Sequence, residues 1–133
     1  MGSTGKDLRK ILSHKQVFDQ PEDVSAYAND ATFYIAKRPP DAVAIPHSTE
    51  DVSKIVKYAF DNRVPVVPRG AGSGLAGGCT PVQGGIVLDM KRMNRIIDID
   101  RRNMTANVEC GVVLDNFNKA LAKERLFYPP DPQ

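Results

Sequence analysis

The sequence predicts an α+β fold whose first part is of α/β type, a small parallel β-sheet with flanking helices. The chain has 133 residues, 41% of them apolar and 26% charged, which suffices for one globular domain with a hydrophobic core. A helical pattern over residues 49–62 lies between two short apolar runs, residues 42–45 and 64–67. Strands joined through a helix usually lie parallel in one sheet, so these segments predict a βαβ unit.

Two helical segments precede this unit. From residue 6 to residue 17 apolar residues recur at helical spacing, at Leu8, Ile11, Leu12 and Val17. A second short helix is expected over residues 19–29, because Pro21 suits the first turn of a helix. The run Arg-Pro-Pro-Asp at residues 38–41 then forbids regular structure and separates these helices from the unit.

The central helical segment carries its own start signal. Ser48 can cap its first turn, with Asp51 at the position where a capping box places an acidic residue or an amide. The helix is expected from Thr49 to Asn62, and its inward face is read from the helical spacing of its apolar residues. Those residues are Val52, Ile55, Val56, Ala59 and Phe60.

Short β-rich runs and one more helix follow the unit. Strands are expected over residues 86–89, 96–100 and 105–109. Asp115 can cap a helix through about Lys123 that buries Phe117, Ala120 and Leu121. The expected organisation is a set of N-terminal helices, a core with a glycine-rich loop, and a last helix that starts a second half: residues 1–40, 41–113 and 114–133.

The glycine-rich segment spans residues 68–85 and holds seven of the ten glycines of the chain. Its run from Gly72 to Gly77 matches GxGxxG, the dinucleotide fingerprint of Rossmann folds. A Rossmann loop opens directly into a helix, which the later glycines and Pro81 exclude here. No Gly-Lys-Ser/Thr occurs in the chain, so a P-loop is excluded as well.

These glycines can still build an anion site from backbone alone. Glycine occupies alternate positions of the loop: Gly70, Gly72 and Gly74. That spacing lets successive N–H groups turn towards one concavity and lets a phosphate approach closely. Ser73 adds a hydroxyl donor, and Arg69 either neutralises the anion or bonds to the loop and holds its shape. A merely flexible linker is disfavoured, because Pro68 and Pro81 frame the segment.

Composition excludes several other classes of function. With 18 basic and 16 acidic side chains the formal net charge is +2, so binding of nucleic acid is not expected. Cys79 and Cys110 fit neither a disulfide framework nor a metal site, and His14 and His47 lack metal-ligand spacing. No apolar run reaches the roughly 20 residues that cross a bilayer, and no secretory signal is recognised. A cytoplasmic location is expected, with membrane association only through a partner.

Four blocks of sequence, in this order, resemble FAD-linked oxidases of the p-cresol methylhydroxylase and vanillyl-alcohol oxidase superfamily: VPVVPRGAGSGLAGG, GGIVLDMKRMNRIIDID, VECGVVLDNFNKAL and FYPPDP. The nearest likeness within it is to the flavin subunit of glycolate oxidase and to D-lactate dehydrogenases. The resemblance implies a bipartite FAD-binding domain, in which a three-stranded parallel subdomain precedes a larger antiparallel one. This chain is expected to supply the first half and to begin the second, as the N-terminal part of a longer protein.

The resemblance also implies which residues meet the cofactor. The loop from Arg69 to Leu75 matches the segment that wraps the FAD pyrophosphate, and Pro130 to Pro132 match residues near the flavin. The expected cofactor-binding residues are Pro68, Arg69, Gly70, Ala71, Gly72, Ser73, Gly74, Leu75, Gly77, Pro130 and Asp131. Ser73 stands where some relatives attach FAD covalently through a histidine, so non-covalent FAD is expected.

The implied activity is FAD-dependent oxidation of a small 2-hydroxy acid, of D-lactate or glycolate type, to the 2-oxo acid. The electron acceptor is left open among oxygen, a quinone, an iron–sulfur subunit and another flavoprotein, and an iron–sulfur subunit or a quinone is the expected partner. Catalytic residues are expected in a later cap domain, so none is assigned here and the chain alone is expected to be inactive. Two alternatives remain open: a non-catalytic module used for binding or assembly, and a reductase of peptidoglycan-precursor type.

Overall fold

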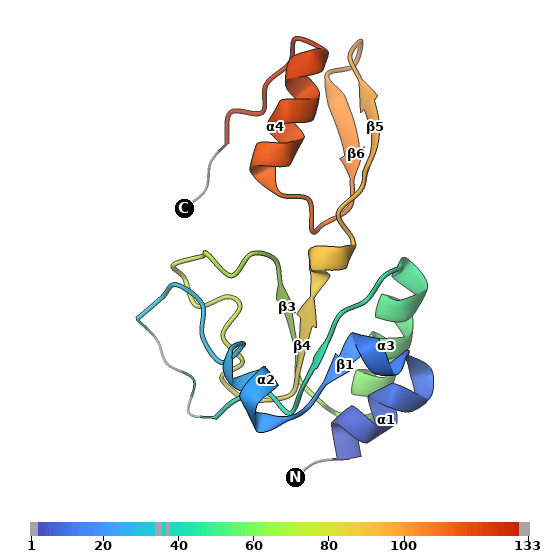
Figure 1. The fold of residues 1–133 in the computed structure, drawn as a ribbon, viewed down its shortest axis with the longest axis vertical. Coiled ribbons are helices and arrows are strands. Elements are labelled where there is room, and N and C mark those ends of the chain that lie inside the picture. The colour runs from blue at the N-terminus through green and yellow to red at the C-terminus, as the bar shows by residue number, and fades with distance from the viewer. Residues whose placement is uncertain (1–2, 34–35, 37, 131–133) are drawn as a thin grey trace.

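The computed structural model describes residues 3–33, 36 and 38–130, which form two parts (Figure 1). The elements of the first part are α1 (Ser3–Ile11), β1 (Val17–Phe18), α2 (Pro21–Ser25), β2 (Ala42–Ala44), α3 (Thr49–Asn62), β3 (Val66–Arg69) and β4 (Ile86–Asp89). The second part, uppermost in Figure 1, consists of β5 (Ile96–Asp100), β6 (Thr105–Val108) and α4 (Leu114–Lys123). This arrangement confirms the predicted α+β fold.

The first part is built on a four-stranded sheet of order β1-β2-β4-β3. Strands β2, β4 and β3 are parallel, as predicted, and β1 adds an antiparallel edge beside β2. Every residue of β2 and β4 is buried, which is typical of parallel strands covered on both faces. Pro68 is tolerated in β3 because β3 is an edge strand. Since β4 lies between β2 and β3, the predicted βαβ unit has a third strand at its centre.

The N-terminal helices are shorter than predicted. The helical pattern over residues 6–17 ends with α1, because Ser13 and Gln16 form a reciprocal cap around a short 3-10 turn. This turn redirects the chain, so Val17 is buried in β1 and not on a helix face. Of the second helix predicted over residues 19–29, α2 covers five residues.

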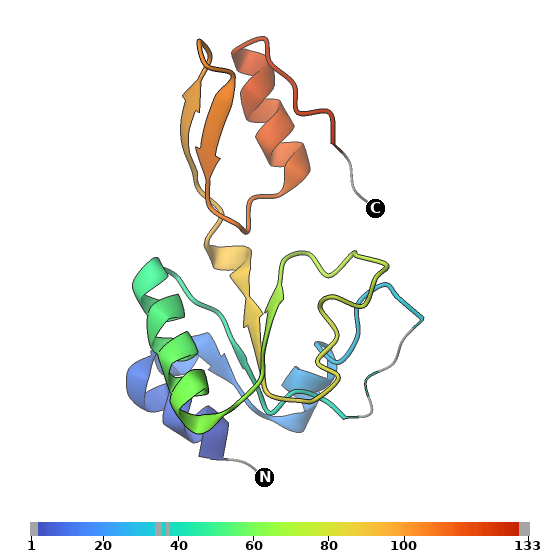
Figure 2. The ribbon, with the colours of Figure 1, turned by 180° about the vertical axis from the view of Figure 1, so that it is seen from behind.

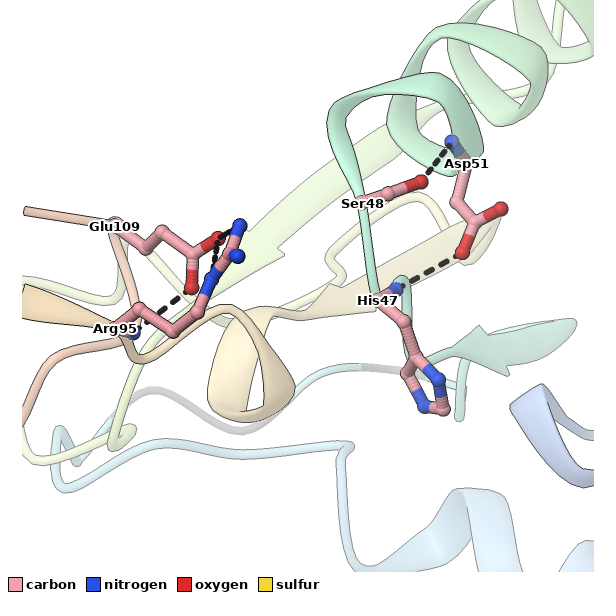
Figure 3. A network of polar contacts seen from close by, with 5 residues as sticks. All are labelled: His47, Ser48, Asp51, Arg95 and Glu109. Atoms are coloured by element: carbon pink, nitrogen blue, oxygen red, sulfur yellow. Dashed lines mark hydrogen bonds and ion pairs between the residues drawn. The ribbon is translucent and has the colours of Figure 1, made fainter. Parts of the chain in front are cut away.

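Helix α3 begins and ends where the sequence predicts. The Ser48 hydroxyl accepts a hydrogen bond from the Asp51 N–H at 3.2 Å (Figure 3). The Asp51 carboxylate accepts from the N–H of His47 at 2.9 Å and from the Gln16 amide at 2.7 Å, so the predicted capping box is only half formed. At the other end Arg63 adopts the left-handed conformation, with a φ of 54°, and terminates the helix.

The buried face of α3 is narrower than predicted. Ile55 and Ala59 are buried in the core against the sheet and α1, as expected. Val56 is 46% exposed and Phe60 is 83% exposed, so their predicted burial is wrong. The sheet and α1 cover one strip of the helix, and its remaining apolar residues line a shallow groove beside β3.

The second part is an antiparallel hairpin of β5 and β6 with α4 beside it (Figure 1). Helix α4 begins without a side-chain cap, so the predicted cap by Asp115 is wrong. Asp115 lies inside the first turn, where it pairs with Lys119 at 2.6 Å. Leu121 is buried as predicted, whereas Phe117 and Ala120 are half-buried.

Candidate functional site

The glycine-rich loop leaves the sheet at the carboxyl end of β3. Ligands of open parallel sheets bind in the crevice outside the carboxyl ends of the strands. Arg69, the last residue of β3, pairs in register with Asp89, the last residue of β4. Figure 2 shows the loop standing out from this edge on the same side as the segment that follows α2.

The loop presents a row of unpaired backbone donors. Within the described ranges, no atom accepts a hydrogen bond from the N–H groups of residues 71 to 78. Gly72 and Gly77 have φ values of +72° and +75°, which glycine adopts without strain. A side chain at Gly70 or Gly74 would meet nothing within 4 Å, so open space lies beside these residues. Free amides next to open space are what a backbone cradle for an anion requires.

Arg69 joins the loop to the segment that follows α2. Its Nη1 donates a hydrogen bond to the carbonyl oxygen of Asn29 at 2.8 Å. Its guanidinium carbon lies 5.5 Å from the centroid of the Tyr27 ring, within the range of a cation–π contact. A Cβ built on Gly72 would overlap the same guanidinium. One side chain therefore contacts the loop and the neighbouring segment at once.

Tyr27 is itself fixed to the end of β4. Its hydroxyl donates to the Asp89 carboxylate at 2.8 Å, and Lys91 reaches the same carboxylate oxygen at 2.8 Å. Burial raises the pKa of Tyr27, and the hydrogen bond to Asp89 raises the pKa of Lys91. Asp89 is only 4% exposed, so this carboxylate is a buried anchor whose charge Lys91 balances.

Asp30 forms a second link between the two segments. Its carboxylate accepts from the Thr32 N–H at 2.9 Å and from the Cys79 N–H at 3.4 Å. These hydrogen bonds, that from Thr32 foremost, hold the pKa of Asp30 below its ordinary value. The Thr32 methyl carbon lies 3.7 Å from where a Cβ of Gly77 would be. Residues 27–32 thus run along the glycine loop and contact it at several points.

The sequence patterns do not predict these contacts. One signal was available, because an aspartate two residues before Thr32 is typical of an Asx turn, which marks a fixed loop. Asp89 had a second signal, since it ends a predicted strand next to the glycine segment.

The expected cofactor residues fall into two groups. Those from Pro68 to Gly77 lie together on β3 and its loop, where Ser73 and Leu75 are exposed. Pro130 lies elsewhere, in the lining of a cavity of about 520 Å³ between β6 and α4. Asp131 lies outside the described residues.

A separate polar contact closes the base of the β5–β6 hairpin (Figure 3). The Arg95 side chain binds the Glu109 carboxylate at 2.7 Å, and the Arg95 N–H donates to it at 2.8 Å. These bonds lower the pKa of Glu109. Within the part of the chain that the structure describes, no three His, Cys, Asp or Glu side chains gather as metal ligands. No helix of that part has the length and apolar character needed to cross a membrane.

The donor set of the loop fits a phosphate-bearing cofactor. Residues 70–78 contain no acidic side chain, and they offer backbone N–H groups together with the Ser73 hydroxyl. Open space at Gly70 and Gly74 admits a group of the size of a phosphate to the backbone. A diphosphate suits this arrangement, because it needs several donors along one stretch of chain.

Several curated proteins resemble the chain along most of its length. Glycolate oxidase subunit GlcD of Bacillus subtilis is 45% identical over 131 residues, which cover 96% of this chain and 28% of that protein. D-lactate dehydrogenase of Anaerostipes hadrus is 32% identical over 123 residues, which cover 92% of this chain and 26% of that protein. The chain thus spans little more than a quarter of the length of these relatives.

Solved structures and a family model agree on the type of domain. The structure of p-cresol methylhydroxylase with substrate bound matches with a TM-score of 0.78 and 26% identity, over 93% of this chain and 25% of that one. Alkyldihydroxyacetonephosphate synthase matches with a TM-score of 0.83 and 27% identity, over 98% and 26% of the two chains. A family model described as FAD binding domain matches residues 40–133. The chain therefore belongs to the family of FAD-binding domains that p-cresol methylhydroxylase represents.

Proposed function

We propose that the glycine loop holds the diphosphate of FAD through its backbone N–H groups. The observation that carries the proposal is the run of residues 71 to 78, whose N–H groups have no acceptor among the described residues, beside the open space at Gly70 and Gly74. Membership of the FAD-binding family supplies the identity of the anion. The proposed contacts come from Pro68, Gly70, Ala71, Gly72, Ser73, Gly74, Leu75 and Gly77. Arg69, the last residue of β3, lies at the base of the loop, where it either meets the anion or holds the shape of the loop.

The proposal places Pro130 and Asp131 near the flavin ring, at the other end of the cofactor. Pro130 follows α4, in the second part of the chain. A cofactor held between the loop and this segment would bridge the two parts. We also propose that FAD is bound without a covalent link, because Ser73 cannot form the bond that a histidine forms in some relatives.

The proposed activity of the whole protein is oxidation of a small 2-hydroxy acid. Names of relatives support it, since the chain is similar to a glycolate oxidase subunit and to D-lactate dehydrogenase. Bound FAD supplies the chemistry by accepting a hydride, and the protein binds, orients and shields it. Residues 68–77 contribute binding and orientation, and no residue of this chain is proposed as a catalytic acid or base. The proposed electron acceptor is an iron–sulfur subunit or a quinone.

A pair of substitutions at Gly74 tests the diphosphate site in the full-length protein. Asp and Asn have nearly the same size, and the open space at Gly74 accommodates either side chain. Because only aspartate repels a diphosphate, Gly74→Asp is expected to weaken FAD binding about tenfold more than Gly74→Asn. The difference should shrink as the salt concentration rises.

Flavin absorbance, and titration of FAD into FAD-free protein, give the measurement. Equal affinities of the Asp and Asn variants at low salt would contradict a diphosphate at this loop.

The absence of a covalent link between FAD and the protein is tested by denaturation, which should release all of the yellow flavin and leave none on the polypeptide. Reduction of an artificial dye with D-lactate or glycolate tests the activity, and a colourless protein would favour the non-catalytic alternative.

A further inference from the structure

The Arg69 guanidinium lies on one particular side of the glycine loop. A Cβ on Gly72 would overlap this guanidinium, so the group occupies the place that a side chain at position 72 would take. The open space lies instead at Gly70 and Gly74, the glycines on either side. An anion in this open space would lie beside Gly70 and Gly74, where a built Cβ does not come within 4 Å of the Arg69 side chain, in contrast to Gly72.

The guanidinium is already engaged by protein groups. It donates to the carbonyl oxygen of Asn29 at 2.8 Å and lies 5.5 Å from the centroid of the Tyr27 ring. The ring is held in turn, because its hydroxyl donates to the buried Asp89 at 2.8 Å. A continuous series of contacts therefore runs from the end of β4 through Tyr27 and Arg69 to the loop backbone at Gly72.

We infer that Arg69 is a positioning residue, which stacks on Tyr27 and sets the shape of the glycine loop, and is not a ligand of the diphosphate. The inference rests on the proposed function, since it concerns how the loop is prepared to receive FAD. A loop with several glycines has many accessible backbone conformations, and ordering it on binding would cost affinity. A rigid support behind Gly72 reduces that cost before the cofactor arrives.

The chemistry of the contact requires arginine and not merely a positive charge. A planar guanidinium can lie over an aromatic ring and donate a hydrogen bond in its own plane at the same time. A lysine ammonium is compact, so it keeps the charge but cannot fill the same flat space beneath Gly72. Charge and shape can therefore be separated by substitution.

The test compares Arg69→Lys with Arg69→Met in the full-length protein, by titrating FAD into the FAD-free form at several salt concentrations. Both variants are expected to bind FAD about tenfold more weakly, because both lose the stacking and the hydrogen bond to Asn29. The dependence of affinity on salt should stay as in the unaltered protein, since no charge in contact with the diphosphate is removed.

Tyr27 provides a matched pair that leaves the loop sequence intact. Tyr27→Leu removes the ring beneath Arg69 and is expected to weaken FAD binding about as much as the Arg69 variants. Tyr27→Phe keeps the ring and is expected to bind FAD within about twofold of the unaltered protein. The double variant Arg69→Met, Tyr27→Leu should bind FAD no more weakly than either single variant, because each substitution removes the same contact between guanidinium and ring.

Two results would overturn the inference. The first is that Arg69→Lys keeps full affinity while Arg69→Met loses it and becomes less sensitive to salt, which is the behaviour of a diphosphate ligand. The second is that Tyr27→Leu binds FAD as well as Tyr27→Phe, a comparison that decides the matter even if the Arg69 variants fail to fold. In both cases the unaltered protein still binds FAD, whereas an unaltered protein without flavin would overturn the proposed function itself.

Discussion

Individual ion pairs of this chain differ widely in how far water reaches them. Arg9 binds Asp19 through two hydrogen bonds, of 2.7 and 2.6 Å, and the two side chains are 23% and 15% exposed. This pair connects α1 to the residue that follows β1. Asp115 and Lys119 on α4 form a pair that is about 70% exposed, where water and salt screen the attraction.

Replacing Asp19 by Asn should therefore cost more stability than the same change at Asp115. Asp19→Asn is expected to lower the free energy of unfolding by about 1–2 kcal/mol at pH 7, because a charge-assisted, two-point hydrogen bond is lost. Asp115→Asn serves as the control and is expected to cost less than about 0.5 kcal/mol. Urea unfolding of the two variants measures both values, and equal losses would contradict this ranking.

The contribution of Asp19 should also depend on pH in a definite direction. The hydrogen bond from Arg9 holds the pKa of Asp19 below its ordinary value of 3.8. A carboxylate whose pKa is lowered by folding stabilises the fold above its unfolded-state pKa and loses that effect as pH falls through the folded-state pKa. The stability gap between the unaltered chain and Asp19→Asn should thus be full at pH 7 and should narrow as the pH falls below 3.8, through the lowered folded-state pKa. A gap that does not narrow at all as the pH is lowered from 7 into the acid range would rule out this titration.

At the level of helices and strands, the sequence correctly predicts those elements whose signals lie within the element itself. Helix α3 is predicted correctly because its cap at Ser48 and its apolar spacing are both local. Strand β1 is not, because Val17 becomes a strand residue only by pairing with Ala44, far along the chain. The burial of Phe60 is overestimated for the same reason, since a helical pattern does not say which flank a neighbour covers.

The candidate site likewise combines features that depend on local sequence with features that depend on distant residues. Glycine spacing marks the loop, because the requirement for small residues is local. The support behind the loop depends on a hydrogen bond between Tyr27 and Asp89, which are 62 residues apart. Only the sheet order, with β4 beside β3, brings Asp89 next to Arg69. Spacing alone could not have paired these side chains.

The connection between the sheet and the hairpin offers a further prediction. A Cβ on Gly111 would overlap the carbonyl oxygen of Met90 and lie 2.9 Å from that of Met93. Gly111→Ala is therefore expected to destabilise the packing of the second part by about 1–3 kcal/mol. Gly78→Ala is the control, since a Cβ there meets nothing within 4 Å. Hydrogen exchange should quicken in β5 and β6 for Gly111→Ala alone, with β2 and β4 unchanged.

In the whole molecule, the two proposed ends of the FAD site belong to different parts. The loop extends from the sheet, whereas Pro130 lines the cavity between β6 and α4. Much of the loop is exposed, including Ser73 and Leu75, so a diphosphate bound there as proposed would be covered by the chain on one side only. We therefore expect most contacts to the flavin ring to lie outside these residues, since the chain spans little more than a quarter of the length of its relatives.

The separation of diphosphate contacts from flavin-ring contacts predicts how the chain of 133 residues binds FAD by itself. It should bind FAD at least about a hundredfold more weakly than the full-length protein, because the ring is not enclosed. ADP shares the diphosphate and lacks the ring, so the chain should bind ADP and FAD with affinities equal to within about threefold. The full-length protein should prefer FAD strongly. Titration calorimetry with both ligands, after circular dichroism has established that the chain is folded, measures the two ratios. A strong preference of the chain for FAD over ADP would mean that these residues bind the flavin ring as well as the diphosphate, which would contradict the prediction.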